Sequence, residues 1–187
     1  MQVLAAEFIK GFIRMADDGY RQGWHERNGG NLSYRIKPEE VDAIKQNFST
    51  ESPFVRIGVK AENLAGEYFL VTRSGNFFRN IAAAPQENLG IVEVDQQGEG
   101  YRVVWGLENG GVPTSEFPSH FLNHSVKKAA TNGAYRVIYH AHPPSIIALT
   151  YLLPLTDKDF SRLLWTMATE CPLVFPDGVG VLPWMVP

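Results

Sequence analysis

The stretch Arg136-Val-Ile-Tyr-His-Ala-His-Pro-Pro-Ser-Ile-Ile-Ala-Leu-Thr-Tyr151 decides how this chain is read. Residues 137–139 are β-branched or aromatic, which is typical of a strand. Residues two apart on a strand point to the same face, so His140 and His142 are expected to lie side by side. Pro143 cannot donate to a ladder of hydrogen bonds and ends the strand, and Pro144 is predicted to open a helix.

This histidine pair suggests a metal site. Two adjacent neutral imidazoles are good ligands for zinc or a similar divalent metal. The pair also comes at the carboxyl end of a strand, where α/β folds often place their chemistry. The alternative is that His140 and His142 are ordinary hydrogen-bonded histidines, and the pair alone leaves both interpretations open.

The overall composition describes an ordinary globular protein. The chain has 187 residues, of which 44% are hydrophobic and 20% charged, enough for one domain with a sizeable core. A net charge of -3 without any basic block gives no indication of a nucleic-acid partner. The single cysteine, Cys171, fits a reducing compartment. The N-terminus lacks a signal-peptide pattern and no apolar run could span a bilayer, so we expect a cytoplasmic protein.

The remaining pattern predicts a mixed sheet with helices. Leu4, Phe8, Phe12 and Met15 recur at helical spacing, with Gly19 as the expected end of that helix. A short surface helix is expected over 38–47. Alternating or apolar runs predict strands at 32–36, 54–59, 67–72, 91–94 and 101–105. The last two flank a turn and predict an antiparallel hairpin, so the sheet is not purely parallel.

Two small polar turns could contact an anion. Residues 28–31 place two glycines between asparagines, and Ser74 and Gly75 follow a predicted strand, where Arg73 could add charge. Such turns can offer amides, hydroxyls and backbone N–H groups to a phosphate. Each turn taken alone also fits an ordinary chain reversal.

A helix is predicted to begin after Pro113. Thr114 or Ser115 can cap it, and Glu116 falls in the first turn, where the helix dipole favours a carboxylate. His120 and His124 lie four residues apart on this helix, and we interpret them as packing or surface residues. Position alone therefore gives Glu116 a structural explanation.

A second carboxylate is harder to explain by position. Residues 160–167 predict a helix with Glu170 near its end, where a carboxylate opposes the helix dipole. Cys171 to Phe175 is predicted to be a strand.

Together these motifs resemble the class II, zinc-dependent sugar-phosphate aldolases, in the branch that acts on L-rhamnulose 1-phosphate. The likeness covers nearly the whole chain in the family's order. It is carried by Glu26-Arg-Asn-Gly-Gly-Asn-Leu-Ser33, Val71-Thr-Arg-Ser-Gly-Asn-Phe-Phe-Arg79, Asn88-Leu-Gly-Ile-Val92, Val112-Pro-Thr-Ser-Glu116, His140-Ala-His142, Thr169-Glu-Cys171 and Val174-Phe-Pro-Asp-Gly-Val-Gly-Val-Leu-Pro-Trp-Met-Val-Pro187.

The resemblance implies a role for individual residues. His140 and His142 match two of the family's three zinc-binding histidines. Glu116 matches the carboxylate that ligates zinc without substrate and acts as acid and base at the ketose carbon. Glu170 matches a carboxylate thought to assist at the aldehyde end. The positions that match those holding the dihydroxyacetone-phosphate part are Asn28, Gly30, Asn31, Ser74, Gly75, Thr114 and Ser115.

The resemblance also implies a fold and a reaction. The expected fold is a central, largely antiparallel β-sheet with helices on both faces, in a protein that assembles into cyclic homotetramers with active sites at subunit interfaces. The expected reaction is reversible cleavage of L-rhamnulose 1-phosphate to dihydroxyacetone phosphate and L-lactaldehyde. In that reaction Zn²⁺ acts as a Lewis acid and stabilises an enediolate.

The sequence departs from the family pattern at one important point. The family's third zinc histidine lies downstream of the Trp-Met-Val-Pro run, where this sequence stops. His25, His120 and His124 match no ligand position. We therefore expect residues 1–187 to form a single aldolase-like domain that is truncated at its C-terminus.

Several alternatives remain. One is a related class II aldolase or epimerase that acts on another sugar phosphate, such as that of fuculose or ribulose. Another is an inactive, metal-poor relative. A cupin would need a glutamate soon after the histidine pair, and a metallo-hydrolase of the His-x-His-x-Asp-His type would not have Pro143 and Pro144 there.

Overall fold

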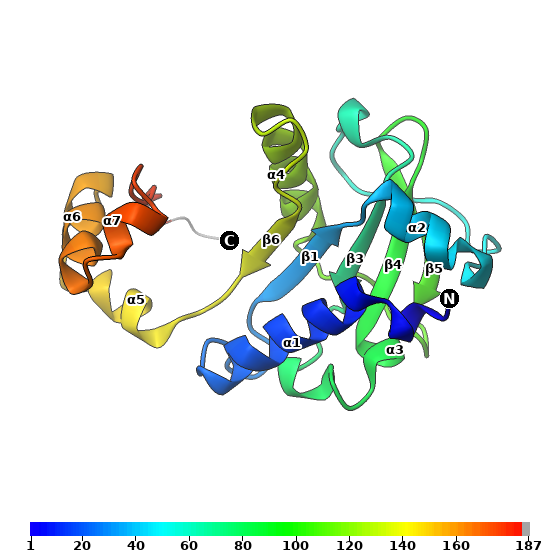
Figure 1. Ribbon diagram of the computed structural model, residues 1–187, viewed down its shortest axis with the longest axis horizontal. Coiled ribbons are helices and arrows are strands. Elements are labelled where there is room, and N and C mark those ends of the chain that lie inside the picture. The colour runs from blue at the N-terminus through cyan, green and yellow to red at the C-terminus, as the bar shows by residue number, and fades with distance from the viewer. Residues whose placement is uncertain (185–187) are drawn as a thin grey trace. The chain divides into compact units, whose positions relative to one another are not determined.

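The computed structural model describes residues 1–184 and contains a six-stranded β-sheet. The strand order is β2-β5-β4-β3-β1-β6, and every neighbouring pair is antiparallel (Figure 1). The strands are β1 Asn31–Arg35, β2 Val55–Arg56, β3 Tyr68–Thr72, β4 Leu89–Val94, β5 Gly100–Gly106 and β6 Val137–His140. The predicted antiparallel sheet is confirmed, although β2 is much shorter than the expected strand at 54–59.

The helices fall into two compact units, Met1–His142 and Pro143–Pro187. The first unit holds the sheet and α1 Glu7–Arg21, α2 Pro38–Ile44, α3 Pro85–Asn88 and α4 Phe117–Ala130. The second unit holds α5 Pro144–Leu149, α6 Asp157–Met167 and α7 Cys171–Val174. The end of the apolar run quoted above, 185–187, lies outside the described residues. The single-domain organisation of residues 1–187 stays a prediction.

Helices cover both faces of the sheet because the strands present apolar residues in both directions. Along β3, Leu70 packs in the core cluster that holds α1 residues such as Phe12. Its neighbour Phe69 points the other way, into a second cluster with Phe121 of α4. This arrangement confirms the predicted class of fold, a sheet between helices.

The buried face of α1 differs from the predicted one. Leu4 and Met15 are both 38% exposed, and the face that is buried consists of Ile9, Phe12, Ala16 and Gly19. The helix continues past Gly19 to Arg21. A Cβ at Gly19 would lie 1.8 Å from the hydroxyl oxygen of Tyr139. This glycine therefore allows a close approach to β6 and does not end the helix.

The segment after Glu170 was also predicted wrongly. Residues 171–174 form the short helix α7 and not a strand, and Pro172 stands in its first turn, where proline is favoured. Helix α6 ends at Met167, so Glu170 does not close it. Glu170 is instead the N-cap residue of α7. Its carboxylate therefore lies at the helix end that favours negative charge.

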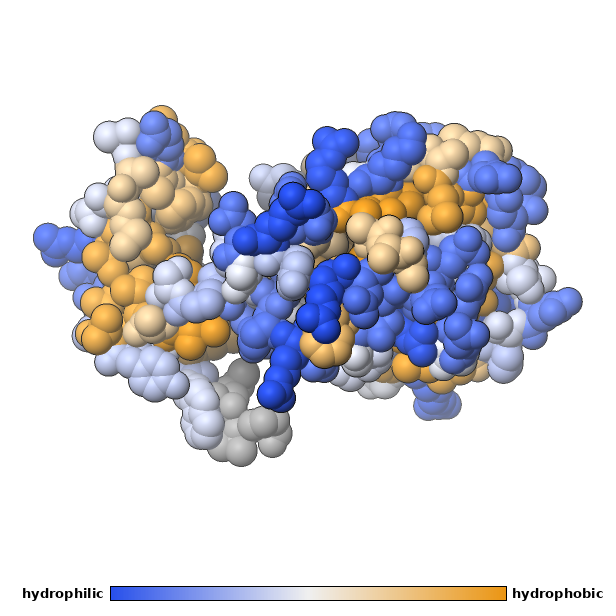
Figure 2. All heavy atoms as spheres, turned by 90° about the horizontal axis from the view of Figure 1, so that it is seen from below, coloured by the Kyte–Doolittle hydropathy of each residue, from blue (hydrophilic) through white to orange (hydrophobic). Residues whose placement is uncertain are grey.

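The second unit buries little of its own apolar surface. Among its described residues only Phe160 and Ser161 are buried. Apolar side chains gather over its surface in Figure 2. Those at least 75% exposed are Tyr151, Leu152, Leu173, Val174, Leu182 and Trp184. Of the helices in the described chain, none has the length and apolar character needed to cross a bilayer.

Candidate active site

Three adjacent strands bring the predicted site to one edge of the sheet, the one at which β1 begins and β3 and β6 end. Asn31 at the start of β1 pairs with His140 at the end of β6. On the other side of β1, Ser33 pairs with Val71, so the start of β1 lies beside the end of β3. The polar turns 28–31 and 73–76 therefore meet at the edge that carries the histidine pair.

The segment before α4 reaches the same edge. Arg73 and Pro113 form an isolated β-bridge. The Ser74 amide donates to the Val112 carbonyl over 2.9 Å, and the Thr114 amide donates to the Thr72 carbonyl over 2.9 Å. These contacts fix the chain just ahead of the carboxylate at position 116.

Glu116 is the N-cap residue of α4, so the helix begins one or two residues later than predicted. Neither Thr114 nor Ser115 is the N-cap residue, although the Thr114 hydroxyl accepts a bond from the Glu116 amide over 3.3 Å. The Glu116 carboxylate lies 2.8 Å from His140 Nδ1 and its side chain is 45% exposed. It therefore meets the histidine pair from an element that is distant in sequence and remains accessible to a substrate.

Each histidine of the pair contacts a carboxylate through the same ring nitrogen. His142 Nδ1 lies 3.0 Å from Glu26 Oε1, just as His140 Nδ1 contacts Glu116. An ionised carboxylate only accepts hydrogen bonds, so both Nδ1 atoms carry the proton. In the neutral rings both Nε2 atoms then present lone pairs, which is the form in which histidine binds metal.

The two Nε2 atoms lie 3.1 Å apart and face each other. Two lone pairs at this distance repel unless a proton or a cation lies between them. A tetrahedral metal site with bonds of about 2.05 Å would separate two nitrogen ligands by about 3.3 Å. The geometry of His140 and His142 therefore fits a shared divalent metal.

The histidine pair does not by itself complete a metal site. Within residues 1–184, no group of three or more His, Cys, Asp or Glu side chains is arranged to hold a metal ion. The Glu116 carboxylate contacts Nδ1 of His140, not the side that faces His142. Direct ligation by Glu116 stays a prediction.

The two glycines of the 28–31 turn are needed for space. A Cβ at Gly29 would lie 2.8 Å from His142 Nδ1. Gly30 has a positive φ of 78°, and a Cβ there would lie 2.6 Å from the His140 carbonyl oxygen. Larger residues would therefore push the turn away from the histidine pair.

His25 supports this turn from the interior. It is 3% exposed and stacks on Phe78 with ring centroids 3.6 Å apart. Its Nδ1 contacts the Gly29 carbonyl over 3.0 Å, and its Nε2 contacts the Tyr139 hydroxyl over 2.7 Å. Burial lowers the pKa of His25, so the ring is held neutral as a structural brace.

Sequence reasoning missed the contact between Glu26 and His142. The hydrogen bond from His142 lowers the pKa of Glu26 and keeps the carboxylate ionised. Glu26 did lie in one of the motif blocks. Its partner is 116 residues away, however, and no local pattern indicates such a pairing.

A buried polar cluster joins β1 to α4. Ser33 Oγ lies 2.7 Å from His120 Nδ1 and 2.8 Å from His124 Nε2, and all three residues are at most 2% exposed. Burial lowers the pKa of His120 to about 4 and that of His124 to about 3. Both rings are therefore neutral at pH 7, and both pack in the interior.

The remaining predicted residues differ in their contacts and in their burial. The side-chain amide of Asn31 lies 3.4 Å from His140 Nδ1. Arg73 Nη1 donates to the backbone carbonyls of Glu87 and Glu108, which orient the guanidinium without neutralising it, and its role toward an anion stays a prediction. Glu170 belongs to the second unit. The exposed or partly exposed candidates at the sheet edge are Asn28, Gly30, Ser74, Gly75 and Ser115, whereas Thr114 is buried.

Comparison with known proteins identifies the family. The family model described as Class II Aldolase and Adducin N-terminal domain matches residues 11–187. The chain belongs to this class II aldolase family. This match confirms the resemblance that the sequence motifs had indicated.

Relatives within the class II aldolases are similar over nearly the whole chain. A rhamnulose-1-phosphate aldolase of Mannheimia succiniciproducens is 48% identical over 99% of this chain and 68% of the relative. One of Escherichia coli O139:H28 is 48% identical over 96% of this chain and 66% of the relative. The chain thus spans about two thirds of the length of these relatives.

A solved structure agrees with the fold. The crystal structure of a sugar-phosphate aldolase from Thermotoga maritima superposes with a TM-score of 0.77 at 25% identity. The superposition covers 97% of this chain and 72% of that chain.

Proposed function

We propose that this chain carries out the reversible retro-aldol cleavage of L-rhamnulose 1-phosphate to dihydroxyacetone phosphate and L-lactaldehyde. The relatives that bear the corresponding name are 48% identical over almost the full chain, which favours this substrate over another sugar phosphate. The observation that carries the proposal is the contact series Glu116–His140–His142 at the sheet edge. It joins an exposed carboxylate to a pair of imidazoles suited to a metal.

His140 and His142 would hold the divalent metal, which we propose to be zinc. When bound, a metal of this kind supplies Lewis-acid stabilisation for the negative charge that develops on the ketose oxygens. The chain contributes the orientation of both rings, because Glu116 and Glu26 hold their Nδ1 protons. In our proposal Glu116 leaves His140 Nδ1 to serve as a metal ligand before substrate binds, as its position in the family implies.

Proton transfer is the task of the carboxylates. Cleavage needs a base for the hydroxyl proton beside the breaking carbon–carbon bond, because that oxygen becomes the carbonyl of the aldehyde. The bonding electron pair stays with the ketose fragment, whose carbon then takes up a proton. We assign the proton at the ketose carbon to Glu116 and assistance at the aldehyde end to Glu170.

Neutral donors at the sheet edge would hold the phosphate. We propose this role for the turns and segment that meet there, through Asn28, Gly30, Asn31, Ser74, Gly75, Thr114 and Ser115. The glycines allow backbone N–H groups to approach an anion closely, and the hydroxyls and amides add hydrogen bonds. A cytoplasmic homotetramer remains the expected form, by resemblance to the family.

An activity assay of two matched variants tests this proposal. Release of dihydroxyacetone phosphate from L-rhamnulose 1-phosphate should require added zinc and should disappear in chelator. The variant E116Q should lose about 10²–10⁴-fold in kcat, the usual effect of removing a general acid or base. E51Q removes the same charge at an exposed position outside the site and should turn over normally. Normal turnover by E116Q or by chelated protein would contradict the proposal.

A further inference from the structure

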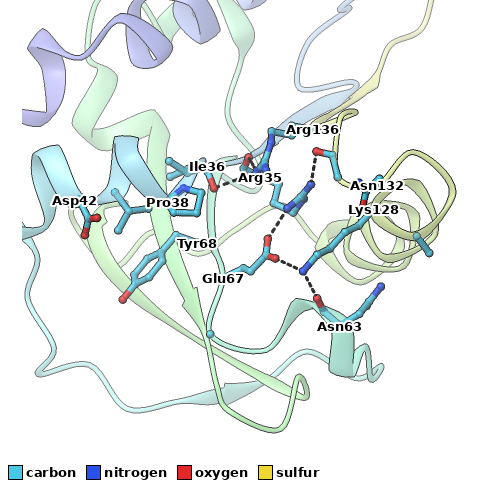
Figure 3. Close-up of a pocket in the computed structure, with 14 residues that line it drawn as sticks. Arg35, Ile36, Pro38, Asp42, Asn63, Glu67, Tyr68, Lys128, Asn132 and Arg136 are labelled. Atoms are coloured by element: carbon cyan, nitrogen blue, oxygen red, sulfur yellow. Dashed lines mark hydrogen bonds and ion pairs between the residues drawn. The ribbon is translucent and has the colours of Figure 1, made fainter.

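A cavity lies at the opposite end of the elements that build the candidate active site. It has a volume of about 650 Å³ and is formed by the end of β1, the start of α2, the start of β3 and the end of α4 (Figure 3). β1 carries Asn31 at the histidine pair and Arg35 at this cavity. Similarly, α4 carries Glu116 at its first end and Lys128 near its last. The two sites are therefore separate.

Cationic side chains dominate the polar part of this cavity. Arg35 is 2% exposed and contacts Glu67 over 2.8 Å, and its Nη2 donates to the Gly133 carbonyl over 2.8 Å. Lys128 pairs with the other oxygen of the same carboxylate. Figure 3 shows Glu67 placed between Arg35 and Lys128, so that one negative charge serves two positive ones.

Arg136 adds a further positive charge without a carboxylate of its own. Its Nη1 donates only to backbone carbonyls, those of Arg35 at 3.3 Å and Ile36 at 3.5 Å. Nowhere in residues 1–184 does a carboxylate come within ion-pair distance of it. The cavity's other acid, Asp42, pairs with Lys45 over 2.7 Å. The cluster of Arg35, Lys128 and Arg136 around one glutamate therefore carries excess positive charge.

The two guanidinium groups lie close together where the chain has no side chain. The Cβ position of Gly133 would be 3.3 Å from Arg35 Nη2 and 3.9 Å from Arg136 Nη2. Like charges brought this close are stabilised by an anion between or beside them. Arg35 acts mainly through its charge because it is buried, whereas Lys128 and Arg136 are partly exposed and can reach a ligand.

The rest of the lining is suited to carbon atoms. Ile36, Pro38 and Val41 form an apolar wall beside the cationic cluster, with the ring of Tyr68 nearby. A bare inorganic ion would leave this wall unused, whereas a small organic anion would fill both parts.

We propose that this cavity binds a small phosphate monoester, with Lys128 and Arg136 on the phosphate and the apolar wall against the carbon part. A dianion matches the excess of positive charge, and the planar fork of an arginine matches phosphate geometry. The proposal does not depend on the reaction assigned to the histidine pair.

A nuclear magnetic resonance titration of deuterated protein with glycerol 3-phosphate tests this site residue by residue. The Gly133 amide reports on the cavity, and the Gly75 amide reports on the candidate active site. The amide resonance of Gly133 should shift as glycerol 3-phosphate is added, and the shift should saturate. K128Q and R136Q should each raise the dissociation constant about tenfold, the effect of losing one charge-assisted hydrogen bond. K127Q removes the same charge from the neighbouring residue of the same helix turn, which lies outside the cavity lining. This variant should bind glycerol 3-phosphate as tightly as the wild type.

A variant that is expected to bind more tightly provides a second test. E67Q removes the acid that competes for Lys128, so glycerol 3-phosphate should bind it more tightly, which general loss of structure cannot mimic. Lack of saturation at Gly133, or equal weakening by K127Q and K128Q, would overturn the proposal. So would binding of succinate in preference to the phosphate ester. A shift at Gly75 alone would support the proposed aldolase site and overturn this one.

Discussion

At the scale of single residues, Glu26 decides which nitrogen of His142 is free. Its carboxylate accepts the Nδ1 proton over 3.0 Å, and this leaves Nε2 facing His140. Without that partner the ring can rotate or adopt the other tautomer. Partners of this kind orient metal-binding histidines and make them more basic.

Replacing Glu26 by alanine should therefore weaken zinc binding about 10- to 100-fold, the usual cost of losing such a partner. Competition with a chromogenic chelator would measure it. E51A serves as the control because Glu51 is exposed and forms no ion pair among the described residues. If E26A bound zinc as tightly as E51A, the orienting role assigned to Glu26 would be wrong.

Whether the sequence could predict a contact of the site depends on how far apart its two residues are along the chain. Strand geometry predicted that His140 and His142 lie side by side, and they do, although β6 ends at His140 and His142 lies just beyond it. The contacts of Glu26 with His142 and of His25 with Tyr139 could not be predicted, because each joins residues more than a hundred positions apart. The roles of the site residues stay predictions, since geometry brings them together without assigning chemistry.

At the scale of elements, Ser33 of β1 ties down the first turns of α4, the helix that starts at Glu116. One hydroxyl proton must serve His120 and His124, so Ser33 can donate to only one ring and must accept from the other. Within the described chain His120 Nε2 and His124 Nδ1 have no further partner. The cluster therefore tolerates neutral rings only.

This cluster predicts a loss of stability in mild acid. The folded-state pKa values are about 4 for His120 and about 3 for His124, against about 6.5 for an unfolded histidine. Below pH 6.5 the unfolded chain takes up protons that the folded chain refuses, so stability falls as pH falls. Between pH 7 and 5 the two rings should cost about 2–4 kcal/mol in the free energy of unfolding.

Urea unfolding across this pH range measures the effect. The double variant H120N/H124Q keeps amide groups near the positions of Nδ1 and Nε2, where each can donate through nitrogen or accept through oxygen, but cannot titrate. Its free energy of unfolding should change less with pH than that of the wild type. Identical slopes would show that the buried pair is not responsible.

Elements were predicted best where a strong local pattern agreed with the packing. The strands β1, β3 and β6 and the hairpin of β4 and β5 follow from alternating, apolar or β-branched runs and from the turn residues between them. The predicted strand from Cys171 to Phe175 was wrong because a short apolar run does not by itself distinguish a strand from a helical turn. The buried face of α1 was misplaced because only tertiary contact with Tyr139 shows why Gly19 faces inward.

At the scale of the whole molecule, the two units differ in how much they bury. The first contains the sheet and two core clusters. In the second, Phe160 and Ser161 are the only buried residues among those described. Little apolar burial gives little stability against local opening.

Amide hydrogen exchange should therefore show two regimes. Amides of α5 and α6 should exchange much faster than those of β3 and β4, because opening the second unit exposes little additional apolar surface. Exchange at one common rate in both regions would mean that the units unfold together.

The central claim is that His140 and His142 share one metal beside Glu116. Calorimetric titration of metal-free protein with zinc tests it most directly. We predict about one zinc per chain, with affinity reduced about 100-fold or more in H140N and in H142N and unchanged in H124Q. Saturable zinc binding that survives H142N, or no zinc binding by the wild type, would contradict the account.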